Sequence, residues 1–142
     1  MGQAMSMDIY ELRNKAYNGR IQPEELAEVI DKIQKYYEHS TDENIDTLLR
    51  IVGYAGCFSD DWERVISEYR GLIEKFSNFS RGPSTSAIAL DILCNDWNLT
   101  TEYIPLIKTY IQGMEWDEGE DVRIMAMFIA GDYVKKCGDK GF

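Results

Sequence analysis

Few residues in this chain could carry catalytic chemistry. The one histidine, His39, lies in a polar stretch, where a solvated linker side chain is the ordinary interpretation. Cys57, Cys94 and Cys137 are widely spaced and form no CxxC pair, which favours reduced packing cysteines over a zinc or disulfide framework. The chain contains no nucleophile elbow, HExxH, P-loop or GxGxxG sequence. We therefore expect a protein that is not an enzyme and that uses no cofactor and no metal.

Carboxylates are the one chemical group that the sequence concentrates. Five of the seven residues from 115 to 121 are acidic, and Trp116 stands among them. Glycine is fifth in this run and Ala126 is twelfth, so the run does not match an EF-hand calcium loop. Acids before a helix complement its positive end, which explains part of the run. The remainder favours a surface for a cation or a basic partner, with Trp116 as a candidate anchor.

The whole chain is acidic as well. Its 142 residues include 25 acidic and 15 basic side chains, which gives a net charge of −10. This balance disfavours nucleic acid and anionic membranes and favours a basic protein partner, although surplus acid can also serve solubility alone. No apolar run approaches the ~18–20 residues that span a bilayer, and the amino terminus lacks the pattern of a secretory signal. We expect a cytoplasmic protein.

Amphipathic helices that could position these carboxylates recur at intervals of 36 to 41 residues. In one register Ile30, Ile33 and Tyr37 match Ile66, Tyr69 and Ile73, and then Ile104, Ile107 and Ile111. In the other, Ile9, Leu12 and Ala16 match Ile45, Leu48 and Val52, then Ser86, Ala89 and Leu93, then Val122, Met125 and Ile129. Such recurrence predicts stacked helix pairs, because one pair cannot bury its own apolar face. No alternating strand pattern competes, so the predicted class is all-α.

The expected helices cover residues 7–17, 23–37, 42–55, 62–76, 84–95, 100–114 and 121–136. Ser40 and Glu43 form a capping-box pattern before the third helix, and Trp62 and Trp97 are expected in the core. The polar run at 78–83 predicts a loop. Together the helices predict an α-solenoid of about three and a half antiparallel pairs. We expect one domain, 1–142, with frayed ends at about 1–6 and 137–142.

Two segments resemble a known family. Residues 121–132 begin Asp-Val-Arg and end in small residues, and residues 102–107 carry an apolar-Pro-apolar-apolar core. In these features the chain resembles the HEAT-like helical repeat family, especially its short bacterial form, over most of its length from about residue 42. The resemblance implies a HEAT- or armadillo-like scaffold that binds proteins. A subset of small acidic members acts as immunity proteins, each of which neutralises a cognate toxin domain.

Charge, repeats and resemblance together favour an immunity protein that binds a basic toxin domain and occludes its active site. A generic adaptor module and, as a lesser alternative, a small helical enzyme built from carboxylates stay open. The predicted partner-binding residues are Asp42, Glu43, Asp46, Glu115, Trp116, Asp117, Glu118, Glu120 and Asp121. The repeat geometry is expected to place these acids, apart from Glu115, along one edge. The acids on the opposite edge would be Asp60, Asp61, Asp96 and Glu102.

Overall fold

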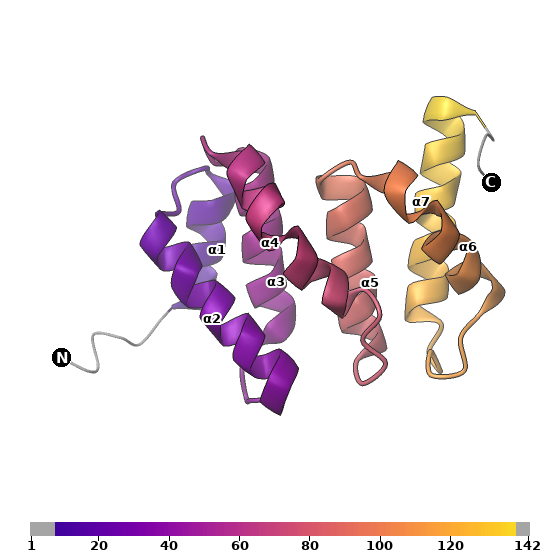
Figure 1. The fold of residues 1–142 in the computed structure, drawn as a ribbon, viewed down its shortest axis with the longest axis horizontal. Helices are drawn as coiled ribbons and strands as arrows, with labels where there is room; N and C mark the ends of the chain where they lie inside the picture. Colours follow the sequence, from indigo (N-terminus) through magenta and orange to yellow (C-terminus); the bar gives the residue numbers. More distant parts are fainter. Residues whose placement is uncertain (1–7, 139–142) are drawn as a thin grey trace. The chain divides into compact units, whose positions relative to one another are not determined.

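A computed structural model describes residues 8–138, and this part of the chain consists of helices and turns without a strand (Figure 1). The predicted all-α class is therefore confirmed. The helices are α1 (Ile9–Tyr17), α2 (Pro23–His39), α3 (Ile45–Phe58), α4 (Trp62–Phe76), α5 (Pro83–Asp91), α6 (Ile104–Gln112) and α7 (Asp121–Cys137). The expected frayed end at 1–6 and most of the one at 137–142 lie outside the described residues. Within them, no helix is both long enough and apolar enough to cross a bilayer.

The chain divides into two compact units, and the boundary falls inside α4. The N-terminal unit extends to Tyr69 and the C-terminal unit begins at Arg70. In the N-terminal unit α1 lies beside α3, and α2 packs against α3 (Figure 1). In the C-terminal unit α5 lies beside α7, and α6 packs against α7. Each unit therefore repeats one order of helices, with α3 and α7 in equivalent positions.

Local backbone geometry sets the helix boundaries of the N-terminal unit. Gly19 ends the turn after α1 with a φ of 73°, and a Cβ there would lie 2.5 Å from the carbonyl oxygen of Phe58. Only glycine fits this close approach. The predicted capping box before α3 is wrong. Ser40 ends α2 in the left-handed region, Glu43 turns toward Lys32, and Asn44 caps α3 instead, accepting a hydrogen bond from the N–H of Thr47.

In the C-terminal unit the predicted loop after α4 is present and is closed by a serine. The Ser86 Oγ accepts a hydrogen bond from the N–H of Phe79 (2.7 Å) and donates one to its carbonyl oxygen. The sixth helix is shorter than predicted, because Pro105 has no N–H to donate to the carbonyl four residues earlier. Its first turn, Thr100–Tyr103, is 3₁₀. The fifth helix ends early as well, and its last predicted turn, Ile92–Asp96, is π-helical.

The two tryptophans expected in the core have different environments. Trp97 is buried, as predicted. Trp62 is 45% exposed, so its assignment to the core is wrong. It is the first residue of α4, and the buried face of that helix begins one turn later at Val65. A residue in the first turn extends past the packed part of its helix even when its spacing fits the apolar stripe.

Candidate protein-binding surfaces

The run of acids at residues 115–121 forms a tight turn, called here the acidic turn, between α6 and α7. Its backbone is fixed by hydrogen bonds from the N–H of Asp117 to the carbonyl of Met114 and from the N–H of Glu120 to the carbonyl of Asp117, both 3.0 Å. The Asp117 carboxylate points inward, is 5% exposed, and accepts hydrogen bonds from the N–H groups of Val122 and Arg123. It therefore caps α7.

This role corrects the prediction that Asp117 is an exposed partner-binding residue. The N-cap position itself is held by Glu120, whose backbone is left-handed (φ 58°) and whose side chain makes no capping bond. The free N–H groups of the first turn must find another acceptor, and a carboxylate placed three residues earlier supplies it. Sequence spacing alone assigns caps to the residue next to the helix, and here the turn moves the cap upstream.

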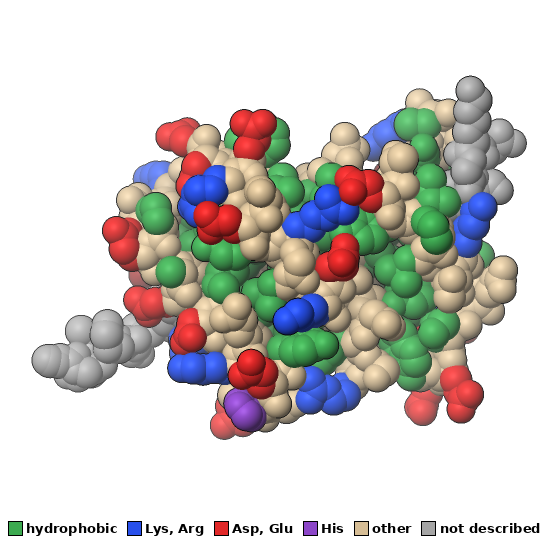
Figure 2. Space-filling view, in the orientation of Figure 1, with side chains coloured by type: hydrophobic (Ala, Val, Ile, Leu, Met, Phe, Trp, Pro, Cys, Tyr) green, Lys and Arg blue, Asp and Glu red, His purple; other side chains and the backbone are tan. Residues whose placement is uncertain are grey.

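The other carboxylates of the acidic turn point outward. Glu120 pairs with Arg123, whose Nε also donates to the carbonyl oxygen of Ile111 at 2.9 Å. The remaining three, Glu115, Glu118 and Asp121, are exposed and have no ion-pair partner among residues 8–138. Figure 2 shows acidic side chains at the loop between α6 and α7. The turn therefore presents open carboxylates on a backbone that is held in place.

Trp116 joins this turn to the helix before it. Its ring packs edge-on against Tyr110, with 5.9 Å between ring centroids and 89° between the planes. The Tyr110 hydroxyl donates to the carbonyl oxygen of Ser77 at 2.6 Å. Burial, and to a lesser extent the charge of Asp117, raises the pKa of Tyr110 to about 12. Trp116 is half-buried, so it supports the turn and offers only part of its ring to a partner.

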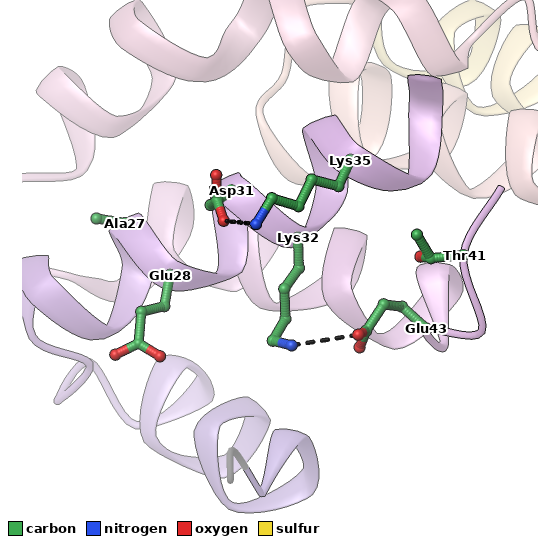
Figure 3. Close-up of a pocket in the computed structure, with 7 residues that line it drawn as sticks. All are labelled: Ala27, Glu28, Asp31, Lys32, Lys35, Thr41 and Glu43. Carbon is green, nitrogen blue, oxygen red and sulfur yellow. Dashed lines mark hydrogen bonds and ion pairs between the residues drawn. The ribbon is translucent and has the colours of Figure 1, made fainter. Parts of the chain in front are cut away.

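The second predicted acidic group lies at the turn between α2 and α3. Here a shallow hollow of about 590 Å³ is lined by the outer face of α2 together with Thr41 and Glu43 (Figure 3). Its charges largely neutralise one another, because Lys32 pairs with Glu43 at 3.2 Å and Lys35 with Asp31 at 3.0 Å. No two carboxylates converge in this hollow as a general acid and base would. The hollow therefore provides no catalytic constellation.

Of this group, Asp42 is exposed, Glu43 is paired, and Asp46 is half-buried with an interaction of its own. The group belongs to the N-terminal unit and the acidic turn belongs to the C-terminal unit. Their common edge therefore stays a prediction. Two acids expected on the opposite edge are ion-paired, since Asp61 contacts Arg64 and Glu102 contacts Arg70.

An exposed group of aromatic rings in the N-terminal unit was missed by sequence reasoning. This aromatic cluster consists of Tyr17, the last residue of α1, with Tyr54 and Phe58 from the last two turns of α3. Tyr17 lies 5.2 Å from each of the other two ring centroids in edge-to-face geometry. The Tyr17 side chain is 58% exposed and Phe58 is nearly as accessible. All three residues fall outside the apolar positions that repeat between the predicted helices. Large aromatic side chains outside those positions were the sequence signal that could have indicated an exposed cluster.

Most charges near the aromatic cluster in sequence are negative, and Arg20, exposed three residues after Tyr17, is the positive exception. The cluster lies at the C-terminal ends of two helices, where the aligned backbone carbonyls carry partial negative charge. Asp60 and Glu63, just after Phe58 in sequence, are exposed and have no ion pair within the described residues. The N-terminal unit has 14 acidic and 7 basic residues, against 11 and 8 in the C-terminal unit. Rings in such a field suit the cation of an arginine or lysine.

The groups capable of other chemistry are scattered. His39 is exposed at the end of α2, near Glu38. In the described part of the chain no three His, Cys, Asp or Glu side chains are placed to hold a metal ion. Burial raises the pKa of the Cys94 thiol to about 12, so it stays protonated near neutral pH. Cys137 is exposed, which corrects its assignment as a packing cysteine.

Comparison of the chain with protein-family models, with curated proteins and with solved structures finds no match. Function must therefore be inferred from the surfaces of the chain itself. The most distinctive of these are the aromatic cluster of the N-terminal unit and the open carboxylates of the acidic turn.

Proposed function

We propose that this chain is a cytoplasmic, non-enzymatic HEAT-like solenoid that binds a basic protein domain, in the manner of an immunity protein that neutralises its cognate toxin. The observation that carries the proposal is the aromatic cluster, because exposed rings at negative helix ends are the side chains and the electrostatic setting that a cationic partner requires.

The repeated helix order supports the solenoid part of the proposal. Tyr10 near the start of α1 contacts Asn44 just before α3, and Tyr17 at the end of α1 contacts Phe58 at the end of α3. The two helices therefore run parallel, with α2 returning between them in sequence. An α-solenoid stacks helices in this way. The helices of the C-terminal unit follow the same order.

The energetics of protein interfaces support the aromatic cluster as the anchor. Binding energy concentrates in a few residues, among which tyrosine, tryptophan and arginine are enriched. An arginine of the partner stacked on Tyr17 or Phe58 would gain a cation–π contact of about 0.5–1 kcal/mol at an exposed site and more once desolvated. Because these rings already pack on one another, little side-chain freedom is lost on binding.

Open carboxylates would accelerate the encounter. Glu115 and Glu118 on the acidic turn, and Asp60 and Glu63 near the aromatic cluster, are exposed without ion pairs in the described chain. Complementary charge steers association and has less effect on the dissociation rate. If the partner's active site binds nucleic acid through basic residues, carboxylates can occupy the same contacts. Occlusion of this kind needs no chemistry from the scaffold.

The test is to express any basic domain that a neighbouring reading frame encodes, and to measure its binding by calorimetry and the protection of cells that express it. The double variant Tyr17→Ser/Phe58→Ser should weaken affinity at least about tenfold, because hot-spot truncations cost more than about 1.4 kcal/mol. Tyr10→Ser is the matched control, since Tyr10 is as exposed and lies in the same helix but outside the aromatic cluster. Equal affinity of the double variant and the control would contradict the proposal.

A charge variant separates steering from anchoring. Glu115→Gln/Glu118→Gln should lower the association rate and its salt dependence while the dissociation rate stays nearly constant. Asp117 is left intact because it caps α7. Glu24→Gln/Glu28→Gln makes the same change in net charge on the exposed face of α2 and serves as the control. If the association rate of a basic partner is the same for the wild type and for both variants, electrostatic capture is excluded.

A further inference from the structure

The last helix of the described chain leaves an apolar face uncovered. Ile124, Met127, Phe128 and Val134 of α7 are all exposed, and Phe128 is the most accessible at 71%. Single exposed apolar residues are common on protein surfaces, but four on one helix face form a patch. The residues on the opposite face, such as Val122 and Ile129, are buried. From Val122 to Ala130 the sequence is apolar except for Arg123, so the sequence alone does not show which face of α7 stays open.

Repeat alignment shows that two of these positions, those of Ile124 and Phe128, match buried residues, whereas Met127 and Val134 match the half-buried Arg50 and Cys57. With Ile45 and Leu48 of α3 matched to Val122 and Met125 of α7, Ile51 corresponds to Phe128. Ile51 has no exposed surface, whereas Phe128 is 71% exposed. Thr47, which matches Ile124, is buried too. Ile124 and Phe128 thus have the composition of a covered position without a cover among residues 8–138, and Met127 and Val134 extend the exposed apolar face beside them.

The spacing on this face is that of a helix-pairing seam. Ile124, Met127, Gly131 and Val134 follow one another at intervals of three, four and three residues, the pattern that packs one helix along another. Gly131 faces open space, so a neighbouring helix can approach closely there. Beside the seam, Asp121 and Lys135 stand seven residues before and seven residues after Phe128. We define the α7 seam as Ile124, Met127, Gly131 and Val134, with Phe128 at its centre.

We propose that the α7 seam binds the α7 seam of a second copy of this chain in an antiparallel, two-fold arrangement. With the two Phe128 rings at the axis, Asp121 of each copy lies near Lys135 of the other. The acidic start and the basic end of α7, Lys135 and Lys136, therefore complement each other only when the helices are antiparallel. The helix surface has an acid at its start, apolar residues in the middle and a base at its end, so two antiparallel copies of it are complementary.

The same charges separate this surface from the one proposed for the basic partner. Lys135 and Lys136 would repel a basic domain from the second half of α7. The aromatic cluster has no such lysine pair and belongs to the other unit. Self-association is therefore independent of the proposed function. One 17-residue helix presents a small interface, so the dimer should be weak, with a Kd in the micromolar range.

Sedimentation velocity on the full chain, from micromolar to near-millimolar concentration, tests the proposal. The wild type should pass from monomer to dimer, and Phe128→Asp should stay monomeric throughout, with a circular dichroism melt equal to the wild type's because Phe128 is exposed. A wild type that is monomeric at every concentration, or a Phe128→Asp variant that dimerises normally, would overturn it.

Charge exchange tests the antiparallel register. Asp121→Lys and Lys135→Asp should each weaken the dimer about tenfold, since each places like charges together twice per dimer. The double variant Asp121→Lys/Lys135→Asp should restore wild-type dimerisation, and failure to restore it would overturn the register. Phe128→Asp should bind the basic domain normally, and Tyr17→Ser/Phe58→Ser should dimerise normally. These two controls distinguish failure of the dimer from failure of the proposed function.

Discussion

The N-terminal and C-terminal units arrange their helices in the same order but present different surfaces. In the N-terminal unit α3 is buried on nearly every side, and the accessible apolar groups are rings at helix ends. In the C-terminal unit α7 occupies the equivalent position and leaves a whole apolar face exposed. The first unit also carries most of the net negative charge. One repeat plan can thus supply an acidic, aromatic surface in one place and a helix-pairing surface in another.

The two units also differ in how the equivalent helices begin. The α3 helix is capped by the residue immediately before it, Asn44. The α7 helix is capped by Asp117, whose carboxylate reaches two backbone N–H groups from within the acidic turn. The second arrangement ties a binding loop to the start of a helix. The buried carboxylate of Asp117 can then hold in place the exposed carboxylates of the same turn, which are open to a partner.

The largest expected effect comes from placing a charge at matched positions of α3 and α7. Ile51→Asp should destabilise the protein by more than about 4 kcal/mol or prevent folding, because it buries an unpaired carboxylate. Phe128→Asp should change the free energy of unfolding of the monomer by less than about 0.5 kcal/mol, since the position is exposed. Urea denaturation at low protein concentration measures both. Similar losses in the two variants would show that the α7 face is covered in the monomer.

A smaller effect is expected at alkaline pH in the C-terminal unit. The Tyr110 pKa of about 12 lies above its ordinary value near 10, so the folded state holds this proton more tightly than the unfolded state. Its contribution is complete below about pH 10 and is lost as pH rises toward 12, by up to about 2–3 kcal/mol.

Tyr110→Phe should lower stability at neutral pH by about 1 kcal/mol, because the hydrogen bond to Ser77 is lost, and should remove part of the alkaline sensitivity. Thermal melts between pH 8 and 12 give both values, with tyrosinate absorbance as the direct measure of titration. An unchanged slope of stability against pH in the variant would exclude Tyr110 as the cause.

The smallest expected difference between the two units is the one between their caps. Asn44→Ala should cost about 1 kcal/mol, because one hydrogen bond to the start of α3 is lost. Asp117→Ala should cost about 2 kcal/mol, since the carboxylate accepts two bonds, is buried, and complements the positive end of α7. Hydrogen exchange at the amides of Val122 and Arg123 should rise only in the second variant. An equal rise in both would contradict the assigned cap.

Prediction from sequence was most accurate where local signals decide. The limits of α4 and the start of α7 follow from apolar period and from caps or turns close in sequence, and both agree with the structure. The short α6 was missed although Pro105 is a local signal for it, because a proline near a helix start is compatible with either a bend or a new start. The early end of α5 was missed because a π turn depends on how the chain must meet its neighbours. Among the predicted site residues, Glu115, Glu118 and Asp121 are exposed, whereas Asp117 is inside.

What the sequence by itself determined is the all-α class, the negative charge and the order of the helices. Helix period, turn residues and net charge are properties of residues close together in the chain, so they can be read without a structure. The tertiary structure alone decided that Asp117 caps a helix, that Tyr17 meets Phe58, and that Phe128 is exposed where Ile51 is buried. Each of these depends on which distant segment, if any, packs against the residue, and identical helical spacing is compatible with either outcome.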